Sequence, residues 1–376
     1  MLEVSIVKKL SAFVLRAEFC AKEEVLGLLG ASGSGKSMLF RCIAGIETPD
    51  SGRIVLDGQV LYDSEAGICL PPRERHVGYL FQDYALFPHM TVGENIRIAI
   101  PGDRRQTKER ESLLKEWLEK MQLYEVKDQY PDRISGGQKQ RTAMVRMLMS
   151  EPECILLDEP FAALDSFLKA GLIRELKGYL REYGKTVLFV SHDRDEIYSL
   201  SDNIACLERG NLGQVQGRED FFLAPGTREA AILSGCKNIS RMQWLDETHV
   251  FAHDFGTELE VCVPDALQAR RGEIGYIGIR AHAFGFLREE AGEPAGVIPD
   301  QNGAVSHTGN PAVNRIDITE CVVEEALFEY TCLCRTPSGG LLQVKYPRTR
   351  ETEASAVLAG TVRQLTVAPE DILLLR

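Results

Sequence analysis

The sequence lacks any run of apolar residues that approaches the roughly 20 needed to cross a bilayer. Its first ten residues, MLEVSIVKKL, also lack the long apolar core of a secretory signal peptide. If the protein works at a membrane, we therefore expect another chain to span it.

The sequence also has no excess of positive charge. It contains 43 Lys and Arg residues against 55 Asp and Glu residues, which gives a net charge of −12. Proteins that bind nucleic acid need a concentrated basic surface to meet the phosphates. The charge balance therefore argues against nucleic acid as the main partner, although it leaves room for a local basic groove.

The ten cysteines include no C-x-x-C pair and show no metal-type spacing. The nearest pair, Cys332 and Cys334, predicts two thiols on one strand face rather than a ligand set. Many free cysteines in a chain of this size are typical of a reducing cytosol.

The 376 residues, of which 44% are hydrophobic and 26% charged, predict a globular protein of two or three domains. Strand and helix patterns alternate up to about Leu233, which favours a mainly parallel sheet covered by helices. From about Gly235, short apolar runs separated by turn signals indicate a second, β-rich domain. We therefore expect domains at 1–233 and 234–376, with a flexible loop over Arg288–Pro311.

The first domain has a clear order of predicted elements. The expected strands are Leu2–Val7, Phe13–Phe19, Val25–Leu29, Gly52–Gly58, Cys154–Leu157 and Thr186–Ser191. The expected helices are Ser37–Ile46, which stops near Glu47–Pro49, Thr107–Met121, which Thr107 caps, one after Gly137, and Ser166–Tyr183, which ends at Gly184.

The stretch GASGSGKS follows a predicted buried strand and opens a predicted helix. This pattern, G-x-x-x-x-G-K-[ST], indicates a phosphate-binding loop whose glycines let backbone N–H groups face an anion. We expect Lys36 to reach the outer phosphates of a nucleotide and the Ser37 hydroxyl to bind Mg²⁺. The expected ATP-binding residues are Gly30, Ala31, Ser32, Gly33, Ser34, Gly35, Lys36, Ser37 and Met38.

The stretch CILLDEP supplies the acidic partner of this loop. Asp158 emerges at the carboxyl end of a buried strand, close to the loop in this type of fold. A carboxylate there can hold Mg²⁺ directly or through water. Glu159 is a candidate general base for the water that attacks the γ-phosphate.

A second anion-binding feature is the sequence of Ser135, Gly136, Gly137 and Gln138. It stands at the start of a predicted helix, where free N–H groups and the helix dipole favour an anion.

A phosphate loop, then Ser-Gly-Gly-Gln before a helix, then a strand that ends in Asp-Glu resembles the ATP-binding-cassette (ABC) ATPases. The resemblance implies that Ser135–Gln138 is the signature motif, which contacts the ATP of the opposite subunit in a head-to-tail homodimer. It also implies catalytic roles for Gln82 and His192 beside Lys36 and Glu159, and a D-loop role for Asp165. The implied Mg²⁺ ligands are Ser37, Gln82 and Asp158.

The fold implied by the resemblance is α/β: an ABC-type nucleotide-binding domain with antiparallel β and helical subdomains, the latter at about 84–150. The stretches Ser234–Ile239 and Ile277–Arg280 resemble the C-terminal regulatory domain of importer ATPases, a small TOBE/MOP-like barrel that pairs two subunits. The family's adenine-stacking aromatic is matched only by Phe13, which fits the core equally well.

The chain has one set of motifs and no membrane span, so it resembles the detached ATPase subunit of an importer at the cytoplasmic face of the cell membrane. Tyr84–Val92 resembles the segment that helps receive the integral-membrane permease, which in turn works with a substrate-binding protein. Asp63–Arg75 and the stretch GCKNIS resemble molybdate importer ATPases. Molybdate (with tungstate) is therefore the first expected cargo and sulfate the second, followed by iron, polyamine and sugar.

Two other classes of function stay open. One is a cytosolic ATP-driven switch without a permease. The other is an oxyanion sensor whose C-terminal domain regulates rather than transports.

Overall fold

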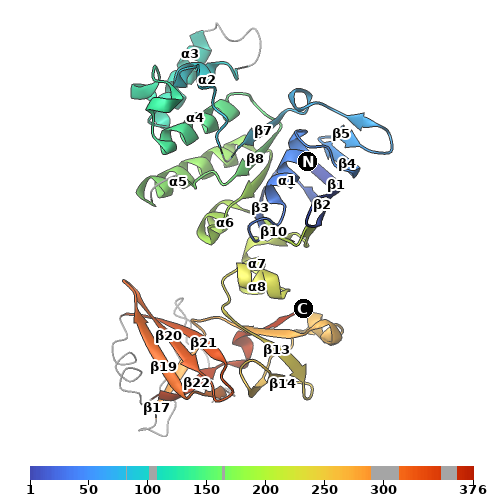
Figure 1. Ribbon diagram of the computed structural model, residues 1–376, viewed down its shortest axis with the longest axis vertical. Coiled ribbons are helices and arrows are strands. Elements are labelled where there is room, and N and C mark those ends of the chain that lie inside the picture. Colours follow the sequence, from blue (N-terminus) through green and yellow to red (C-terminus); the bar gives the residue numbers. More distant parts are fainter. Residues whose placement is uncertain (82, 101–107, 163–165, 289–312, 349–361) are drawn as a thin grey trace. The chain divides into compact units, whose positions relative to one another are not determined.

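The computed structural model describes residues 1–81, 83–100, 108–162, 166–288, 313–348 and 362–376 (Figure 1). The chain divides into two compact units, Met1–Arg218 and Glu219–Arg376. The sequence places the boundary later, after Leu233. The difference arises because the guanidinium of Arg280 donates to the carbonyls of Ser234 (3.3 Å) and Phe222, which ties the segment after residue 218 to the second unit.

In the first unit, the described strands form one 12-stranded sheet in the order β6-β5-β4-β1-β2-β11-β10-β3-β9-β8-β7, with β12 beside β10. The parallel part consists of β7 (Val77–Leu80), β8 (Cys154–Asp158), β9 (Thr186–Val190), β3 (Val25–Leu29) and β10 (Asn203–Glu208). Every residue of β3, β8 and β9 is buried, as expected for parallel strands with both faces covered.

The rest of this sheet is mostly antiparallel. It contains β1 (Leu2–Lys9), β2 (Val14–Ala21), β4 (Ser51–Leu56), β5 (Gln59–Asp63), β6 (Ile68–Cys69), β11 (Asn211–Leu212) and β12 (Gln216–Gly217). β1 alternates buried and exposed residues over its first five positions, which indicates that one face is packed and the other solvated.

Two groups of helices accompany the sheet. α1 (Lys36–Ala44), α5 (Ser166–Tyr183) and α6 (Arg194–Leu200) belong to the first group. α2 (Val92–Arg97), α3 (Lys108–Lys120) and α4 (Gly136–Leu148) belong to the second, with 3-10 turns at Pro72–Glu74, Tyr124–Val126 and Pro131–Arg133. α2 packs on α4 and α4 contacts β7, so the second group lies beyond the β7 edge, where the sequence predicts a helical subdomain (Figure 1).

Two predicted helix ends can be compared with the structure. Gly184, which follows α5, has φ 61°, as a left-handed C-cap requires. The helix predicted over Ser37–Ile46 ends two residues earlier, at Ala44, because Gly45 takes a left-handed φ of 80° and donates to the carbonyl of Cys42. The predicted cap Thr107 lies outside the described residues.

The second unit is built from β-sheets, as the sequence predicts. Its described sheets have the orders β15-β14-β13-β16-β23, β17-β22-β18 and β19-β20-β21, and all their pairings are antiparallel. The strands of the first sheet are β13 (Asn238–Trp244), β14 (His249–Ala252), β15 (Thr257–Glu260), β16 (Tyr276–Ile279) and β23 (Ile372–Leu375). The others are β17 (Gly285–Arg288), β18 (Asn314–Asp317), β19 (Glu320–Glu325), β20 (Glu329–Arg335), β21 (Leu341–Pro347) and β22 (Val362–Val367).

Short helices complete this unit: α7 (Arg218–Leu223), α8 (Arg228–Leu233), α9 (Asp265–Gln268) and 3-10 turns at Arg271–Glu273 and Pro369–Asp371. One apolar core joins residues of all three sheets, including Val250, Cys332 and Leu365, each 0% exposed. The stretch RIDITECVV, one of the short apolar runs of the second unit, divides into two strands of different sheets, β18 and β19.

Candidate nucleotide site

The phosphate loop joins β3 to α1, the context that its motif predicts. Gly35 stands directly before α1 with φ 110°, a conformation that a residue with a Cβ rarely adopts. A Cβ on Gly30 would lie 2.4 Å from the carbonyl oxygen of Leu207, so this position has no room for a side chain. Gly30 is therefore required by lack of space, and Gly35 by its backbone conformation.

Lys36 folds back over the loop. Its Nζ donates to the carbonyls of Gly30 (2.7 Å) and Ala31 (3.0 Å), and only 6% of the residue is exposed. Burial lowers the pKa of Lys36, and the nearby carboxylates of Glu159 and Asp158 oppose that effect without cancelling it. The loop thus holds a poorly solvated cation that an anion would stabilise.

Ser34 gives a second sign of an anion site. Its hydroxyl is buried and has no hydrogen-bond partner among the described residues. Buried hydroxyls are normally satisfied, so this one suggests a ligand that provides the partner.

Asp158 ends the buried strand β8 and is 3% exposed. The hydroxyl of Tyr79 donates to its Oδ2 at 3.1 Å. Burial, followed by the negative charge of Asp158, raises the pKa of Tyr79, so the phenol keeps its proton at physiological pH. Tyr79 is not predicted from the sequence as a site residue; its position near the carboxyl end of β7, next to β8, is the signal that points to it.

Glu159 and His192 meet across the ends of β8 and β9. His192 Nε2 lies 2.5 Å from Glu159 Oε1. Glu159 has a left-handed φ of 51°, and its N–H donates to the carbonyl of Val190 at 3.0 Å. This turn directs the carboxylate of Glu159 toward His192. The structure thus brings together Lys36, Asp158, Glu159 and His192 through direct contacts or short-range electrostatics.

A polar cluster supports the segment that carries His192. Lys169 Nζ lies 2.5 Å from both Asp193 Oδ2 and Glu196 Oε1, and Ser191 donates its hydroxyl to Glu196. Burial tends to lower the pKa of Lys169, but its hydrogen bonds to the two carboxylates raise it overall. The sequence analysis did not single out these residues, because the contacts join positions 24 and 27 residues apart, on α5 and around the start of α6.

Ser135 caps α4 rather than joining the phosphate loop of its own chain. Its Oγ accepts from the N–H of Gln138 (3.3 Å), and its own N–H donates to Gln138 Oε1 (2.9 Å). Ser135 and Gly136 are exposed. No hydrogen bond or ion pair between described residues links this helix start to Gly30–Ser37. Gln82 and Asp165, the other predicted site residues, lie outside the described residues.

Phe13 lies beside the phosphate loop and also packs against the apolar core of the first unit. Its ring is partly buried against the core, and a Cβ on Gly35 would approach it to 3.3 Å.

The donor types at the site suit Mg²⁺, which prefers oxygen ligands and usually keeps several waters. Ser37 is the second residue of α1 and offers a hydroxyl, and Asp158 is the last residue of β8 and offers a carboxylate, whose Oδ2 accepts from the hydroxyl of Tyr79. Within the described ranges, no group of three or more His, Cys, Asp or Glu side chains could hold a metal. A metal here would therefore need oxygens from a nucleotide and water in addition to these two residues.

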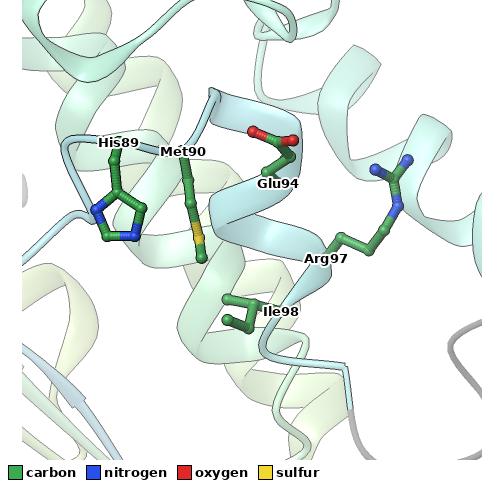
Figure 2. Close-up of a pocket in the computed structure, with 5 residues that line it drawn as sticks. All are labelled: His89, Met90, Glu94, Arg97 and Ile98. Carbon is green, nitrogen blue, oxygen red and sulfur yellow. The ribbon is translucent and has the colours of Figure 1, made fainter.

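A groove of about 440 Å³ lies in the helical part of the first unit, next to α2 (Figure 2). His89, Met90, Glu94, Arg97 and Ile98 line it, so it combines apolar side chains with charges of both signs. His89 and Met90 lie within Tyr84–Val92, the segment that the sequence predicts to contact a permease, and the other lining residues lie just after it.

The fold and the site together define a phosphate-loop nucleotide-binding unit: a glycine loop before a helix, and acidic residues at the end of a neighbouring parallel strand. The family described as ABC transporter matches residues 18–162. The chain is 34% identical over 288 residues to the trehalose/maltose import ATP-binding protein MalK of Thermococcus litoralis, covering 77% of this chain and 75% of that protein. The chain therefore belongs to the ABC transporter ATP-binding proteins, and its first unit is an ABC ATPase domain.

Other relatives import different cargoes. The chain is 40% identical over 216 residues to the spermidine/putrescine import ATP-binding protein PotA of Bacillus cereus, covering 57% of this chain and 64% of that protein. It is 40% identical over 208 residues to the sulfate/thiosulfate import ATP-binding protein CysA of Bradyrhizobium diazoefficiens, covering 54% and 59%. These two matches span less than two thirds of the relatives' length.

Proposed function

We propose that this protein is the ATP-hydrolysing subunit of an ABC importer. The observation that carries the proposal is the convergence of Lys36, Asp158, Glu159 and His192 around a loop with a buried, unsatisfied hydroxyl at Ser34. These four side chains supply what phosphoryl transfer to water needs: a cation for the phosphates, a metal ligand, a base and a group that contacts the γ-phosphate.

Each residue then has one task. The backbone of Gly30–Ser37 and the ammonium of Lys36 bind the β- and γ-phosphates of ATP. Glu159 accepts the proton of the attacking water at its carboxylate, and His192 orients Glu159 and contacts the γ-phosphate. Ser37, Asp158 and Gln82 would hold Mg²⁺, which neutralises the phosphate charge when it is bound.

The functional form is a homodimer. Ser135 and Gly136 at the start of α4 are exposed, no hydrogen bond or ion pair between described residues joins them to the phosphate loop of the same chain, and helix N-termini favour anions. We propose that this helix start meets the γ-phosphate of ATP bound to the second chain, with Asp165 at the same interface. ATP then closes the dimer, and hydrolysis opens it.

The partner in the membrane is a permease with integral spans, and the protein works peripherally at the cytoplasmic face. No described helix is long and apolar enough to cross a bilayer. The groove at His89, Met90 and Ile98 offers apolar contact for a permease segment (Figure 2). A substrate-binding protein would deliver cargo to that permease.

The cargo is an oxyanion, with molybdate first and sulfate second. The segment Asp63–Arg75 and the stretch at 235–240 support molybdate by resemblance, and the relative CysA supports sulfate. Both stretches also have structural tasks. Arg75 is fully buried and donates to the carbonyls of Cys42 and Ile43, and Asn238 joins Ile279 to Gln343. Part of the resemblance of these two stretches to molybdate importer ATPases therefore comes from residues that stabilise the fold.

The second unit pairs with its copy in the dimer and regulates closure, as a small TOBE/MOP-like barrel. Its three sheets around one core support this assignment. A sensor function in place of transport would require this unit to bind the oxyanion. Titration of the full chain with molybdate in a calorimeter tests that alternative, and heat that saturates at micromolar ligand would favour it.

The deciding experiment measures cellular molybdenum by elemental mass spectrometry at limiting molybdate. Cells whose sole copy is wild type are compared with cells whose sole copy carries Glu159→Gln. We expect molybdenum to fall strongly in the variant while sulfate uptake is unchanged. Equal molybdenum in both, with no backup importer, would contradict molybdate as the cargo. Failure to co-purify any integral membrane protein would favour a cytosolic switch.

A further inference from the structure

One arginine of α4 makes two hydrogen bonds to the backbone of the segment that follows position 82. Arg146 of α4 donates from Nη1 to the carbonyl of Ala85 (2.8 Å) and from Nη2 to the carbonyl of Tyr84 (2.9 Å). Its guanidinium also lies 5.5 Å from the centroid of the Phe87 ring. Arg146 is partly buried, and burial lowers the pKa of its guanidinium.

The backbone that Arg146 holds is strained. Tyr84 and Ala85 are consecutive non-glycine residues in the left-handed region, with φ 62° and 44°. Such residues persist only where the surroundings impose them, and they concentrate at sites that move or bind. Two carbonyls turned toward one guanidinium supply that constraint here.

The far end of the same segment is held by α2. Asn95 is 0% exposed; its Oδ1 accepts from the N–H of Phe87 (2.8 Å), and its Nδ2 donates to the carbonyls of Phe87, Met90 and Thr91. The segment from Tyr84 to Thr91 is therefore fixed to the helical part of the unit at both ends. It begins two residues after position 82 and contributes His89 and Met90 to the groove.

Arg146 also shares a rigid element with the proposed trans site. α4 begins at Gly136, and ten residues of helix separate Gly136 from Arg146, a span of about 15 Å. A displacement of the helix start reaches Arg146 because α-helices of this length move as rigid bodies.

We propose that Arg146 is a positioning residue that makes the segment 84–91 move with α4 when the partner's ATP engages Ser135. This inference rests on the proposed function and deepens it. The contacts of Arg146 would thus link the nucleotide bound to one chain with the groove and the Gln82 region of the other chain. Arg146 itself contacts no nucleotide.

The test uses hydrogen exchange of the full chain, with and without Mg·ATP, in a Glu159→Gln background that retains ATP. Three double variants add Arg146→Met, which keeps the apolar stem; Arg146→Lys, which keeps the charge but not the fork; and Arg174→Met, which removes an exposed arginine of α5. The two regions followed are 135–139 and 84–90.

We expect ATP to slow exchange about fivefold or more in both regions of the parent and of Arg174→Met. In Arg146→Met the slowing should remain at 135–139 and disappear at 84–90, with Arg146→Lys between the two. Full ATP-dependent slowing at 84–90 in Arg146→Met would overturn the inference, as would loss of slowing in both regions. Absence of slowing at 135–139 in the parent would instead overturn the proposed dimer closure, and the inference with it.

Discussion

His192 Nε2 lies 2.5 Å from Glu159 Oε1, so the two groups that we propose to act on the attacking water and the γ-phosphate already touch each other. The left-handed turn at Glu159 and the hydrogen bond from its N–H to Val190 hold this arrangement from the backbone side. In the proposed mechanism, the base is thus oriented by the same group that contacts the γ-phosphate.

Replacement of Glu159 by Gln should separate binding from hydrolysis. An amide cannot accept the proton of water, so we expect turnover to fall about 100-fold or more while ATP still binds. Phosphate release measures turnover, and light scattering after size exclusion detects the ATP-bound dimer. Glu153→Gln is a matched control, because Glu153 precedes the strand that Glu159 follows. Wild-type turnover in Glu159→Gln would contradict the assignment.

Replacement of Lys36 by Met should raise the melting temperature without nucleotide. Burial lowers the pKa of Lys36, so the folded state disfavours its charged form, and that cost is present in full below the folded pKa. The cost disappears as pH rises through the folded pKa toward the unfolded value of 10.5. We expect a rise of about 2 °C at pH 7 that shrinks at alkaline pH.

The same Lys36→Met variant should lose the stabilisation that ATP gives to the wild type, because the phosphates lose their cation. Scanning calorimetry at several pH values, with and without Mg·ATP, measures both effects. A lower nucleotide-free melting temperature in the variant would show that its hydrogen bonds to Gly30 and Ala31 outweigh the desolvation of Lys36.

Replacement of Arg75 by Leu should destabilise the first unit. Arg75 is fully buried and donates to the carbonyls of Leu70 (2.8 Å), Cys42 and Ile43 (2.9 Å each), and these carbonyls would lose their partner. We expect a loss of about 3 kcal/mol in the free energy of unfolding, measured in urea. Arg73→Leu, at a side chain that is 84% exposed, should change it by less than about 0.5 kcal/mol.

The cysteines should divide sharply in reactivity. Burial raises the pKa of Cys154 to about 12, so its thiolate is scarce at pH 8, whereas Cys20, Cys69 and Cys262 are exposed. Iodoacetamide at pH 8 followed by peptide mass spectrometry should label these three exposed cysteines and leave Cys154 unlabelled until the protein is unfolded. Rapid labelling of Cys154 in the folded chain would mean that β8 opens locally.

The sequence predicts several elements around the candidate nucleotide site well, because the patterns that encode them lie in contiguous stretches. Val25–Leu29 is a strand at the predicted bounds, and α5 runs over the predicted Ser166–Tyr183. Tyr79, Arg75 and Arg146 escape prediction for one reason. Their partners are 79, 33 and 61 residues away, and no local pattern encodes such contacts.

The β-rich unit shows the same limit. An apolar run predicts that a strand exists but not which sheet it joins. RIDITECVV reads as one segment, yet Ile316 pairs with Leu365 in one sheet and Val322 with Leu333 in another. Pairing partners are set by packing across the whole unit, here by a core common to three sheets.

The capping box at Ser135 and Gln138 has a consequence for how a lone chain behaves. Two N–H donors at this helix start, those of Ser135 and Gln138, are occupied by the chain's own side chains, so part of the surface that would attract an anion is already satisfied. Free phosphate must displace the side chains of Ser135 and Gln138 to reach these two donors. A terminal phosphate presented by a second folded chain arrives already positioned, so it can win that competition where a dissolved anion does not. In the proposed dimer, the cap thus makes assembly depend on bound nucleotide rather than on free phosphate in the surrounding solution.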